Sequence, residues 1–459
     1  MKVSGKIFAS RAWLSTEWQS DVRVTIKDGV IIAVDVQATP AAGDICVDTL
    51  LPALANLHSH SFQRAMAGMT EFRAAGQDSF WTWRTLMYQF LDHLTPEQIE
   101  AIAGLVFMEM LEAGYASVGE FHYVHHQLGG VRYDDPAETT HRIMAAATQS
   151  GIGLTHLPVL YTYGGAGQAE LGHGQLRFGN SVDEFSAIVE VTKSAATTMF
   201  ADTIVGIAPH SLRATSPDEL AKITTAYGDG PIHIHIAEQP KEVVEITGWL
   251  GARPVEWLLN NQNVASNWCL IHATHMTDTE TTVLAKSGAV AGLCPITEAN
   301  LGDGPFNGPG YLAAGGAFGL GSDSNVRISL TEELRTLEYS QRLRDLQRNV
   351  MVKDTGSVGK TLYLGAAAGG AQALGRKAGE IRPGYLADMV AINSQHPYLC
   401  NLTPDQIFDG LCFAADDSVI SDTWSAGRHM VQGGQHIKRD AIIANYQAAI
   451  AQLKTSLTS

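Results

Sequence analysis

The sequence predicts an α/β fold, a (β/α)8 barrel of the TIM type with a small β-sandwich domain built from both termini. Three observations lead to this prediction. Short apolar runs alternate with longer stretches patterned as helices, strand-like segments broken by glycine and proline lie near both ends, and polar side chains follow most of the apolar runs. A length of 459 residues suits one barrel with a modest accessory unit.

The end segments are patterned as strands. Residues 22–26 alternate with the period of a strand, turn at Asp28 and Gly29, and resume as the apolar run 30–34, which predicts a hairpin. Residues 379–392 and 423–435 show similar short strands. We therefore expect a β-sandwich from residues 1–50 and 377–437, a barrel from residues 51–376, and a C-terminal helix at 438–459.

Eight apolar runs are the expected barrel strands. They comprise residues 51–57, 116–121, 152–160, 203–208, 231–236, 268–271, 289–293 and 317–321. The helix before the second run has clear limits: Thr95 as N-cap, Pro96 at the first helical position, Gln98 completing a capping box, and Gly114 as the stop. Repeated units of this kind build a parallel sheet.

Polar residues directly after the runs favour a barrel over the alternative, a doubly wound open sheet. The active site of a (β/α)8 barrel lies at the C-terminal ends of its strands. The residues found there are His58, His60, Tyr123, His210, Arg213, His235, Glu238, His272 and Asp323. An open sheet would not place histidines at so many strand ends.

Four of these residues form an expected metal site. His58 and His60 stand two residues apart on one side of a strand end, and His235 and Asp323 end two further runs. Taken alone, a His-x-His pair is more often accidental than ligating, and Asp323 could simply form an Asx turn. Their shared barrel position favours ligation, whereas His233 is expected to be a hydrogen-bonded interior histidine.

The expected site implies chemical roles. A Zn2+ or Fe2+ ion lowers the pKa of water from 15.7 to about 7, and Asp323 could accept the proton released. Glu238 is placed to shuttle a proton to a leaving amine, and His272 could polarise or orient the water, although a buried structural histidine is the alternative. Because Pro209 and His210 follow the fourth run where a lysine could bridge two metals, one ion per chain is expected.

Composition excludes several other functions. A formal net charge of −16 gives no electrostatic footprint for nucleic acid. The first 20 residues contain no apolar core of a signal peptide, and no apolar run is long enough for a membrane span, so a cytoplasmic location is expected. Five scattered cysteines without a Cys-x-x-Cys pair indicate reduced thiols and no Cys-rich zinc site.

The order and spacing of His58-x-His60, His235-x-x-Glu238, His272 and Asp323 resemble the mononuclear deaminase branch of the amidohydrolase superfamily, over nearly the whole chain. Within the branch, the sequence most closely resembles the formimidoylglutamate deiminases of histidine degradation. Residues 57–66, 80–84, 119–126 and 208–213 carry this closer resemblance. The Pro-x-Ser-Asn segment common in the superfamily is replaced by PITEAN at 295–300, which we expect to affect loop contacts and not the metal.

The resemblance implies metal-dependent hydrolysis of N-formimino-L-glutamate to N-formyl-L-glutamate and ammonia, one divalent ion, and a homodimer. A substrate with two carboxylates needs planar cationic groups, and Arg84 and Arg213 can supply two. Tyr123, His210 and Gln63 are further candidate substrate contacts. For Arg84, packing against nearby tryptophans is the alternative.

Two other functions remain open from the sequence. A deaminase of a cyclic amidine or nucleobase, such as guanine, adenosine or cytosine, would use the same metal site, but a neutral base does not need paired arginines. A barrel that serves as a non-catalytic scaffold would not need the ligands together with Glu238 and His272.

Overall fold

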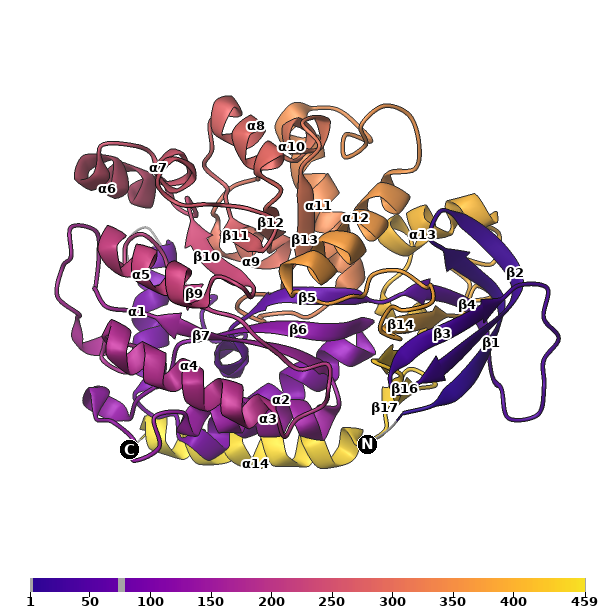
Figure 1. Cartoon of the computed structure of the whole chain (residues 1–459), viewed down its shortest axis with the longest axis horizontal. Coiled ribbons are helices and arrows are strands. Elements are labelled where there is room, and N and C mark those ends of the chain that lie inside the picture. The colour runs from indigo at the N-terminus through magenta and orange to yellow at the C-terminus, as the bar shows by residue number, and fades with distance from the viewer. Residues whose placement is uncertain (1–2, 73–78, 459) are drawn as a thin grey trace.

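The predicted barrel is confirmed. The computed structural model describes residues 3–72 and 79–458, and its parallel strands follow one another around a closed sheet (Figure 1). The strands are β5 (Leu54–Ser59), β6 (Tyr115–His122), β7 (Gly153–Leu160), β8 (Ile204–Val205) with β9 (Ala208–Pro209), β10 (Ile232–Ile236), β11 (Trp268–His272), β12 (Val290–Leu293) and β13 (Ala317–Leu320). Pairing of β13 with β5 closes one side. Bridges from Ile207 to Ile232 and from Ser211 to His235 close the other.

Three of the expected segments extend beyond the described residues. The expected ranges 1–50, 51–376 and 438–459 include residues 1–2, 73–78 and 459, which lie outside the part of the chain that the structure describes.

Two expected strands differ in detail from the structure. The first run, 51–57, divides at Ala53, because Leu51 and Pro52 belong to β4 (Ile45–Pro52) of the other sheet. The fourth run is interrupted at Gly206, where a Cβ would lie 2.4 Å from the carbonyl oxygen of Pro231. Only glycine allows β10 to approach so closely at this point.

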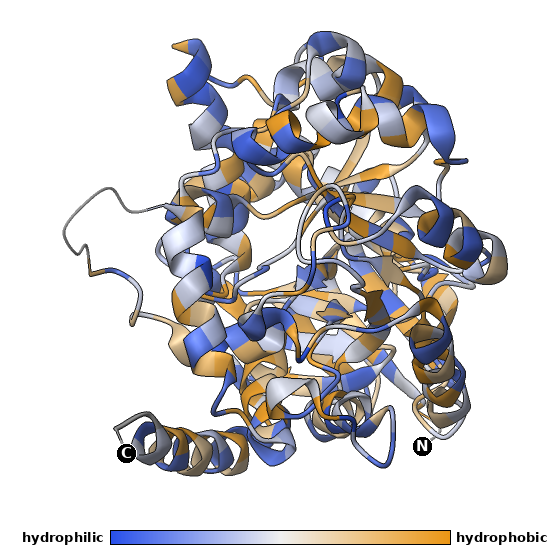
Figure 2. Cartoon of the chain, turned by 90° about the vertical axis from the view of Figure 1, so that its left-hand side faces the viewer, coloured by the Kyte–Doolittle hydropathy of each residue, from blue (hydrophilic) through white to orange (hydrophobic). Residues whose placement is uncertain are grey.

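Helices surround the barrel and carry both hydrophobic and hydrophilic residues (Figure 2). They are α1 (Phe80–Leu91), α2 (Pro96–Glu112), α3 (Glu138–Ser150), α4 (Val182–Ala196), α5 (Pro217–Tyr227), α6 (Pro240–Leu250), α7 (Pro254–Asn261), α8 (Asp278–Ser287), α9 (Pro295–Leu301), α10 (Gly308–Ala313), α11 (Leu330–Asp345), α12 (Val358–Ala373), α13 (Ile407–Phe413) and α14 (Arg439–Thr458). The α2 prediction is confirmed: Thr95 and Gln98 form the capping box, and Gly114 has a φ of +93°.

Strands from both ends of the chain form the second sheet, in the order β17-β16-β15-β14-β4-β1-β2-β3. Besides β4 it contains β1 (Gly5–Leu14), β2 (Glu17–Lys27), β3 (Val30–Asp35), β14 (Met389–Ile392), β15 (Ile420–Ser425), β16 (Arg428–Gln432) and β17 (Gln435–His436). The predicted hairpin is β2 and β3, with positive φ at both Asp28 and Gly29. The ends meet where β4 pairs with β1 on one side and β14 on the other.

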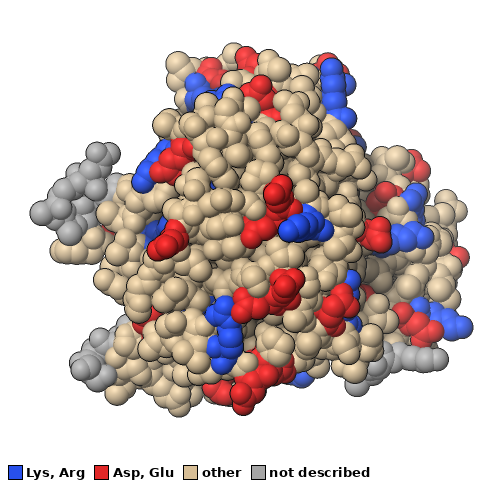
Figure 3. All heavy atoms as spheres, turned by 60° about the vertical axis from the view of Figure 1, so that its left-hand side comes forward, with Lys and Arg blue, Asp and Glu red and all other residues tan. Residues whose placement is uncertain are grey.

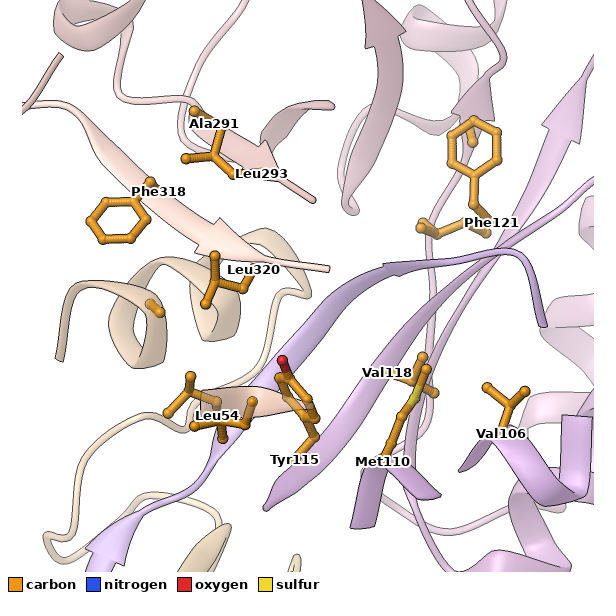
Figure 4. Packing of buried hydrophobic residues seen from close by; sticks show 14 of the residues in the cluster. Leu54, Val106, Met110, Tyr115, Val118, Phe121, Ala291, Leu293, Phe318 and Leu320 are labelled. Carbon is orange, nitrogen blue, oxygen red and sulfur yellow. The ribbon is translucent and has the colours of Figure 1, made fainter. Parts of the chain in front are cut away.

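The α2 face and the first barrel strands share one hydrophobic core. Figure 4 shows Val106 and Met110 of α2 near Val118 of β6, with Tyr115 close to Leu54. All five side chains are buried. This packing anchors the beginnings of β5 and β6, and the first candidate site residues lie at the opposite, C-terminal ends of these strands.

A buried ion cluster joins the barrel to the second sheet. Asp202, just before β8, lies 2.9 Å from Arg376 Nη2 and 2.6 Å from Arg428 Nη1 of β16. Asp388, next to β14, lies 3.2 Å from the same Arg376. Burial acts to raise the pKa of Asp202, but hydrogen bonds and charge from both arginines hold it well below its ordinary value.

Within the described ranges, no helix is both long and apolar enough to cross a membrane.

Candidate active site

The four expected ligands meet at the C-terminal ends of β5, β10 and β13. His235 Nε2 lies 3.1 Å from His58 Nε2 and 3.3 Å from His60 Nε2. Asp323 Oδ1 lies 3.4 Å from Nε2 of both His58 and His60. All four side chains are buried, and the four atoms form a compact group that could hold one metal ion.

The donor atoms fit a divalent ion. His60 Nδ1 donates to the carbonyl oxygen of Phe121 (2.9 Å), and His235 Nδ1 donates to that of His210 (3.1 Å). This leaves two Nε2 lone pairs facing each other without a proton between them. Tetrahedral Zn2+ places neighbouring nitrogen ligands about 3.3 Å apart, which agrees with the observed spacing. Burial lowers the pKa of both imidazoles, so the neutral, ligating form is favoured.

Backbone pairing fixes Asp323 between His58 of β5 and His60, which directly follows β5. The Asp323 N–H donates to the carbonyl oxygen of His58 (3.0 Å), and the His60 N–H donates to that of Asp323 (2.9 Å). Asp323 has a φ of +47°, an unfavourable conformation for a residue with a side chain. Asn325 supports it by donating from Nδ2 to the Asp323 carbonyl oxygen at 2.9 Å. The carboxylate is thus held in place before any ion binds.

Glu238 and His272 lie beside this cluster. His272 Nε2 is 3.8 Å from Glu238 Oε1 and 3.9 Å from Asp323 Oδ2, so the imidazole stands between two carboxylates. Burial raises the pKa of Glu238. Burial alone would lower the pKa of His272, but the charge of Glu238 and the hydrogen bond to Glu298 raise it to about 10. The group can therefore hold and pass protons near the metal ligands.

Glu298 was not predicted as a site residue. Its Oε1 accepts from His272 Nδ1 (3.2 Å) and from the Cys294 N–H (3.0 Å). The Nδ1 proton is thereby held on the far side of the ring, and Nε2 faces the site. His272 has a φ of +67°, which shows that the strand end is bent to present this ring. Glu298 belongs to the 295–300 segment, which was expected to affect only loop contacts. This segment therefore also orients a site histidine.

Glu242 was also missed. Its carboxylate is fully buried and accepts the backbone N–H of Ala237 (3.0 Å) and of Glu238 (3.1 Å). It lies 3.9 Å from Arg213 Nε. Ala237 has a φ of +51°, so the turn that carries Glu238 is strained and needs such support. The only sequence signal is a glutamate at the third position of a helix that begins with Pro240, a pattern that ordinary helix capping also explains.

All five expected substrate contacts line one pocket together with the metal ligands His60, His235 and Asp323. The space between its walls, including the part open to solvent, is about 540 Å3. Its walls include the expected residues Gln63, Arg84, Tyr123, His210 and Arg213. Gln63 Nε2 donates to the Tyr123 hydroxyl at 2.8 Å. Aromatic and apolar side chains from α1, from the segment after β7 and from the end of α9 complete the walls, among them Trp83, Tyr88, Phe178 and Leu301.

The two arginines differ in their surroundings. Arg213 is buried, 3.7 Å from Glu238 Oε2, and its Nε has no hydrogen-bond partner in the described part of the chain. Arg84 is half-buried, with its guanidinium 5.3 Å from the ring centroids of both Trp81 and Tyr88. The packing expected as an alternative for Arg84 therefore coexists with a place in the pocket wall.

Other histidines and one arginine have structural contacts. His233 is buried and bonds to the carbonyl oxygen of Ala373 at 2.8 Å, which confirms the interior reading. His122, His125 and His126 are buried and bond to Thr139 Oγ1, to the Val159 carbonyl oxygen and to the Gly179 carbonyl oxygen respectively. Arg64 pairs with Glu109 and with the backbone oxygens of Asn325 and Val326, away from the pocket.

Comparisons with known proteins agree with this geometry. The profile of the amidohydrolase family matches residues 49–429, and that of the N-terminal domain of formimidoylglutamate deiminase HutF matches residues 5–46. A formimidoylglutamate deiminase of Pseudomonas aeruginosa is 47% identical over 94% of this chain and 95% of its own length. A 5-methylthioadenosine/S-adenosylhomocysteine deaminase of Natronomonas pharaonis is 26% identical over 94% of this chain and 90% of its own length.

Solved structures show the same architecture. An amidohydrolase from Brucella melitensis superimposes with a TM-score of 0.94 at 46% identity, covering 98% of this chain and 100% of the other. An adenosine deaminase from Xanthomonas campestris with bound zinc superimposes with a TM-score of 0.81 at 21% identity, covering 98% of each chain. At that lower identity the likeness concerns the fold alone.

Proposed function

The chain belongs to the amidohydrolase family, and on that premise we propose that it is a formimidoylglutamate deiminase. It hydrolyses N-formimino-L-glutamate to N-formyl-L-glutamate and ammonia, a step of histidine degradation. The observation that carries this proposal is the presence of Arg84 and Arg213 in the same pocket as the four-ligand cluster. The relative of that name, at 47% identity, supports it.

The substrate matches the pocket in charge. Its two carboxylates need charge-assisted donors, and a guanidinium can bind a carboxylate through two parallel hydrogen bonds. Arg213, with an unpartnered buried Nε, binds one carboxylate, and Arg84 binds the other. Tyr123, Gln63 and His210 contact the formimino end. A neutral nucleobase would give the hydrogen-bond donors of Arg84 and the unpartnered Nε of Arg213 no carboxylate to bind, which disfavours nucleobases as substrates.

His58, His60, His235 and Asp323 would hold one divalent ion, with Zn2+ preferred and Fe2+ compatible with the same donors. Such an ion, when bound, lowers the pKa of a water molecule from 15.7 to about 7. A cytoplasmic homodimer remains a prediction from the sequence.

The protein residues move the protons of the reaction. Asp323 accepts a proton from the attacking water as the oxygen bonds to the formimino carbon, whose C=N electron pair passes to nitrogen. Glu238 delivers a proton to that nitrogen, which becomes an amino group. Asp323 then passes its proton to this amino group, the hydroxyl oxygen forms the carbonyl as the C–N bond breaks, the hydroxyl proton returns to Glu238, and ammonia leaves. His272, 3.8 Å from Glu238 and 3.9 Å from Asp323, orients the water and stabilises charge on both carboxylates. Arg213 holds the substrate next to Glu238.

The proposal is tested by measuring ammonia release from N-formimino-L-glutamate by zinc-loaded enzyme, with guanine, adenosine and cytosine as competing candidates. Turnover of the formimino substrate alone is the expected result. Faster turnover of any nucleobase would replace this function with a nucleobase deaminase. Inactivity on every compound, with the metal bound, would favour the scaffold alternative.

A further inference from the structure

A second cavity adjoins the active-site pocket. The space between its walls, including the part open to solvent, is about 1100 Å3, and it shares four wall residues with the pocket, namely Arg84, Tyr161, His210 and Arg213. Its outer wall consists of Trp81 on α1, the glycine-rich segment 164–167, and Lys241, Glu245 and Gly248 on α6. We call this space the outer cavity. Because the two arginines belong to both walls, they stand at the boundary between the spaces.

Cations gather around one aromatic ring in the outer cavity. Lys241 Nζ lies 4.3 Å from the Trp81 ring centroid, Arg84 Cζ lies 5.3 Å from it, and Arg213 Cζ lies 5.9 Å from it. Glu245 in this wall lies 3.7 Å from Lys241 Nζ, and Glu238 and Glu242, outside the wall, lie beside Arg213. On the face shown in Figure 3, basic side chains lie beside acidic ones. In a chain of net charge −16, the wall of the outer cavity carries three basic side chains, Arg84, Arg213 and Lys241, and one acidic side chain, Glu245.

A third cavity, smaller than the outer cavity, also adjoins the active-site pocket. The space between its walls, including the part open to solvent, is about 220 Å3, and it shares Gln63 and Trp83 with the pocket. Among the described residues, its walls contain no charged side chain. A substrate with two carboxylates that entered by this route would lose water from both without meeting a positive charge, which is costly. The outer cavity offers more room and the compensating charge.

We propose that the outer cavity is the vestibule through which a dicarboxylate substrate reaches the metal cluster, and that Lys241 is a specificity-determining residue that captures it. This inference rests on the proposed function. One carboxylate first meets Lys241 against the Trp81 ring and then passes to Arg84 and Arg213, which line both spaces. Clefts lined by charges of one sign raise the local concentration of an oppositely charged ligand. Lys241 and Glu245 are partly exposed, with 58% and 36% of their side chains accessible, so their effect should weaken with salt.

The charge test uses two variants of opposite sign. At low ionic strength, Lys241→Gln should lower kcat/KM for N-formimino-L-glutamate by about threefold, and Glu245→Gln should raise it by about twofold, with kcat unchanged in both. In about 0.5 M NaCl, both ratios should approach one, because the screening length falls to a few ångströms.

Lys193 supplies a matched control. It is also an exposed helical lysine, with Nζ 4.6 Å from the Tyr227 ring centroid and 3.4 Å from Glu190, but it lines neither space. Lys193→Gln should leave kcat/KM unchanged. A steric test is independent of charge: Gly248→Phe places a ring in the outer cavity, where a Cβ at Gly248 would meet nothing within 4 Å. That variant should lower kcat/KM at both salt concentrations.

The outcomes separate the two proposals. If wild-type enzyme releases no ammonia from N-formimino-L-glutamate, the proposed function fails and this inference fails with it. Two outcomes with active wild-type enzyme would overturn the vestibule alone. In the first, Lys241→Gln and Gly248→Phe both have wild-type kcat/KM. In the second, Lys193→Gln lowers kcat/KM as much as Lys241→Gln does. Opposite shifts in the two charge variants, removed by salt, support it.

Discussion

Replacing Glu242 with glutamine should damage catalysis from a position that does not line the pocket. The change keeps the size of the side chain and one acceptor oxygen. It removes the charge next to Arg213 Nε and one of the two acceptors used by the Ala237 and Glu238 N–H groups. A buried amide NH2 would then face a backbone N–H, donor against donor. The strained turn that carries Glu238 should relax away from its position over the metal cluster.

The size of the effect follows from these contacts. One hydrogen bond to a charged group contributes about 1.5–3 kcal/mol, and about 2 kcal/mol of lost transition-state stabilisation corresponds to roughly a 30-fold lower kcat. Displacing a reacting group by about 1 Å costs a similar or larger factor, on the order of 100-fold. A severalfold higher KM should accompany this, because Arg213 loses the partner at 3.9 Å that helps to fix it.

The assay compares kcat and KM for ammonia release by wild-type enzyme and the Glu242→Gln variant, with metal content and thermal unfolding measured on the same preparations. Glu256→Gln is the matched control, because Glu256 is also the third residue of a helix that begins with proline, but it is exposed. The control should keep wild-type kinetics. A Glu242→Gln enzyme with full metal content and a kcat within about twofold of wild type, the range that ordinary surface substitutions give, would refute the positioning role.

Three further predictions concern the metal, the substrate and the fold. Removing the metal with a chelator should abolish activity, and Zn2+ should restore it at about one ion per chain; full activity without metal would contradict the site. Arg213→Met and Arg84→Met should each lower kcat/KM for the dicarboxylate by about 10- to 100-fold, and normal kinetics in both would remove the basis for the substrate. Asp202→Asn should lower the urea midpoint at pH 7, because breaking a buried ion pair costs about 3–5 kcal/mol. Since the folded-state pKa of Asp202 is depressed, this stabilisation is complete above the unfolded pKa of about 3.9 and is lost below it. The difference between variant and wild type should therefore shrink as the pH falls below about 4, and a constant difference would contradict the cluster's role.

The barrel and the metal ligands could be predicted because both depend on local patterns. Strands buried on both faces have short apolar sequences, and their C-terminal ends converge at one rim of the barrel. Side chains such as His58, His235 and Asp323 are therefore brought together whatever the helices between them contain. The sequence patterns did not predict the β1 strand. The first run was assigned wholly to the barrel because Leu51 and Leu54 are equally apolar, although they lie in different sheets.

Glu242 and Glu298 could not be predicted in the same way, because each acts from the first turns of a helix. A glutamate near a helix N-terminus is common on ordinary stability grounds, since it complements the helix dipole. Its side chain becomes important only when the preceding strand end bends back toward it. Those bends are the positive φ values at Ala237 and His272, which follow from tertiary packing and have no mark in the sequence.

The sheet made from both ends of the chain has a consequence for synthesis of the protein. Leu50 of β4 pairs with Ala391 of β14, about 340 residues later. A ribosome that adds about 5–20 residues per second reaches the β14 strand roughly 17–70 s after β4 has been made. Throughout that interval one edge of β4 lacks its partner, and open strand edges associate readily with other chains. Slower translation of the barrel lengthens this exposure, so the yield of soluble protein should depend on elongation speed as well as on the stability of the finished fold.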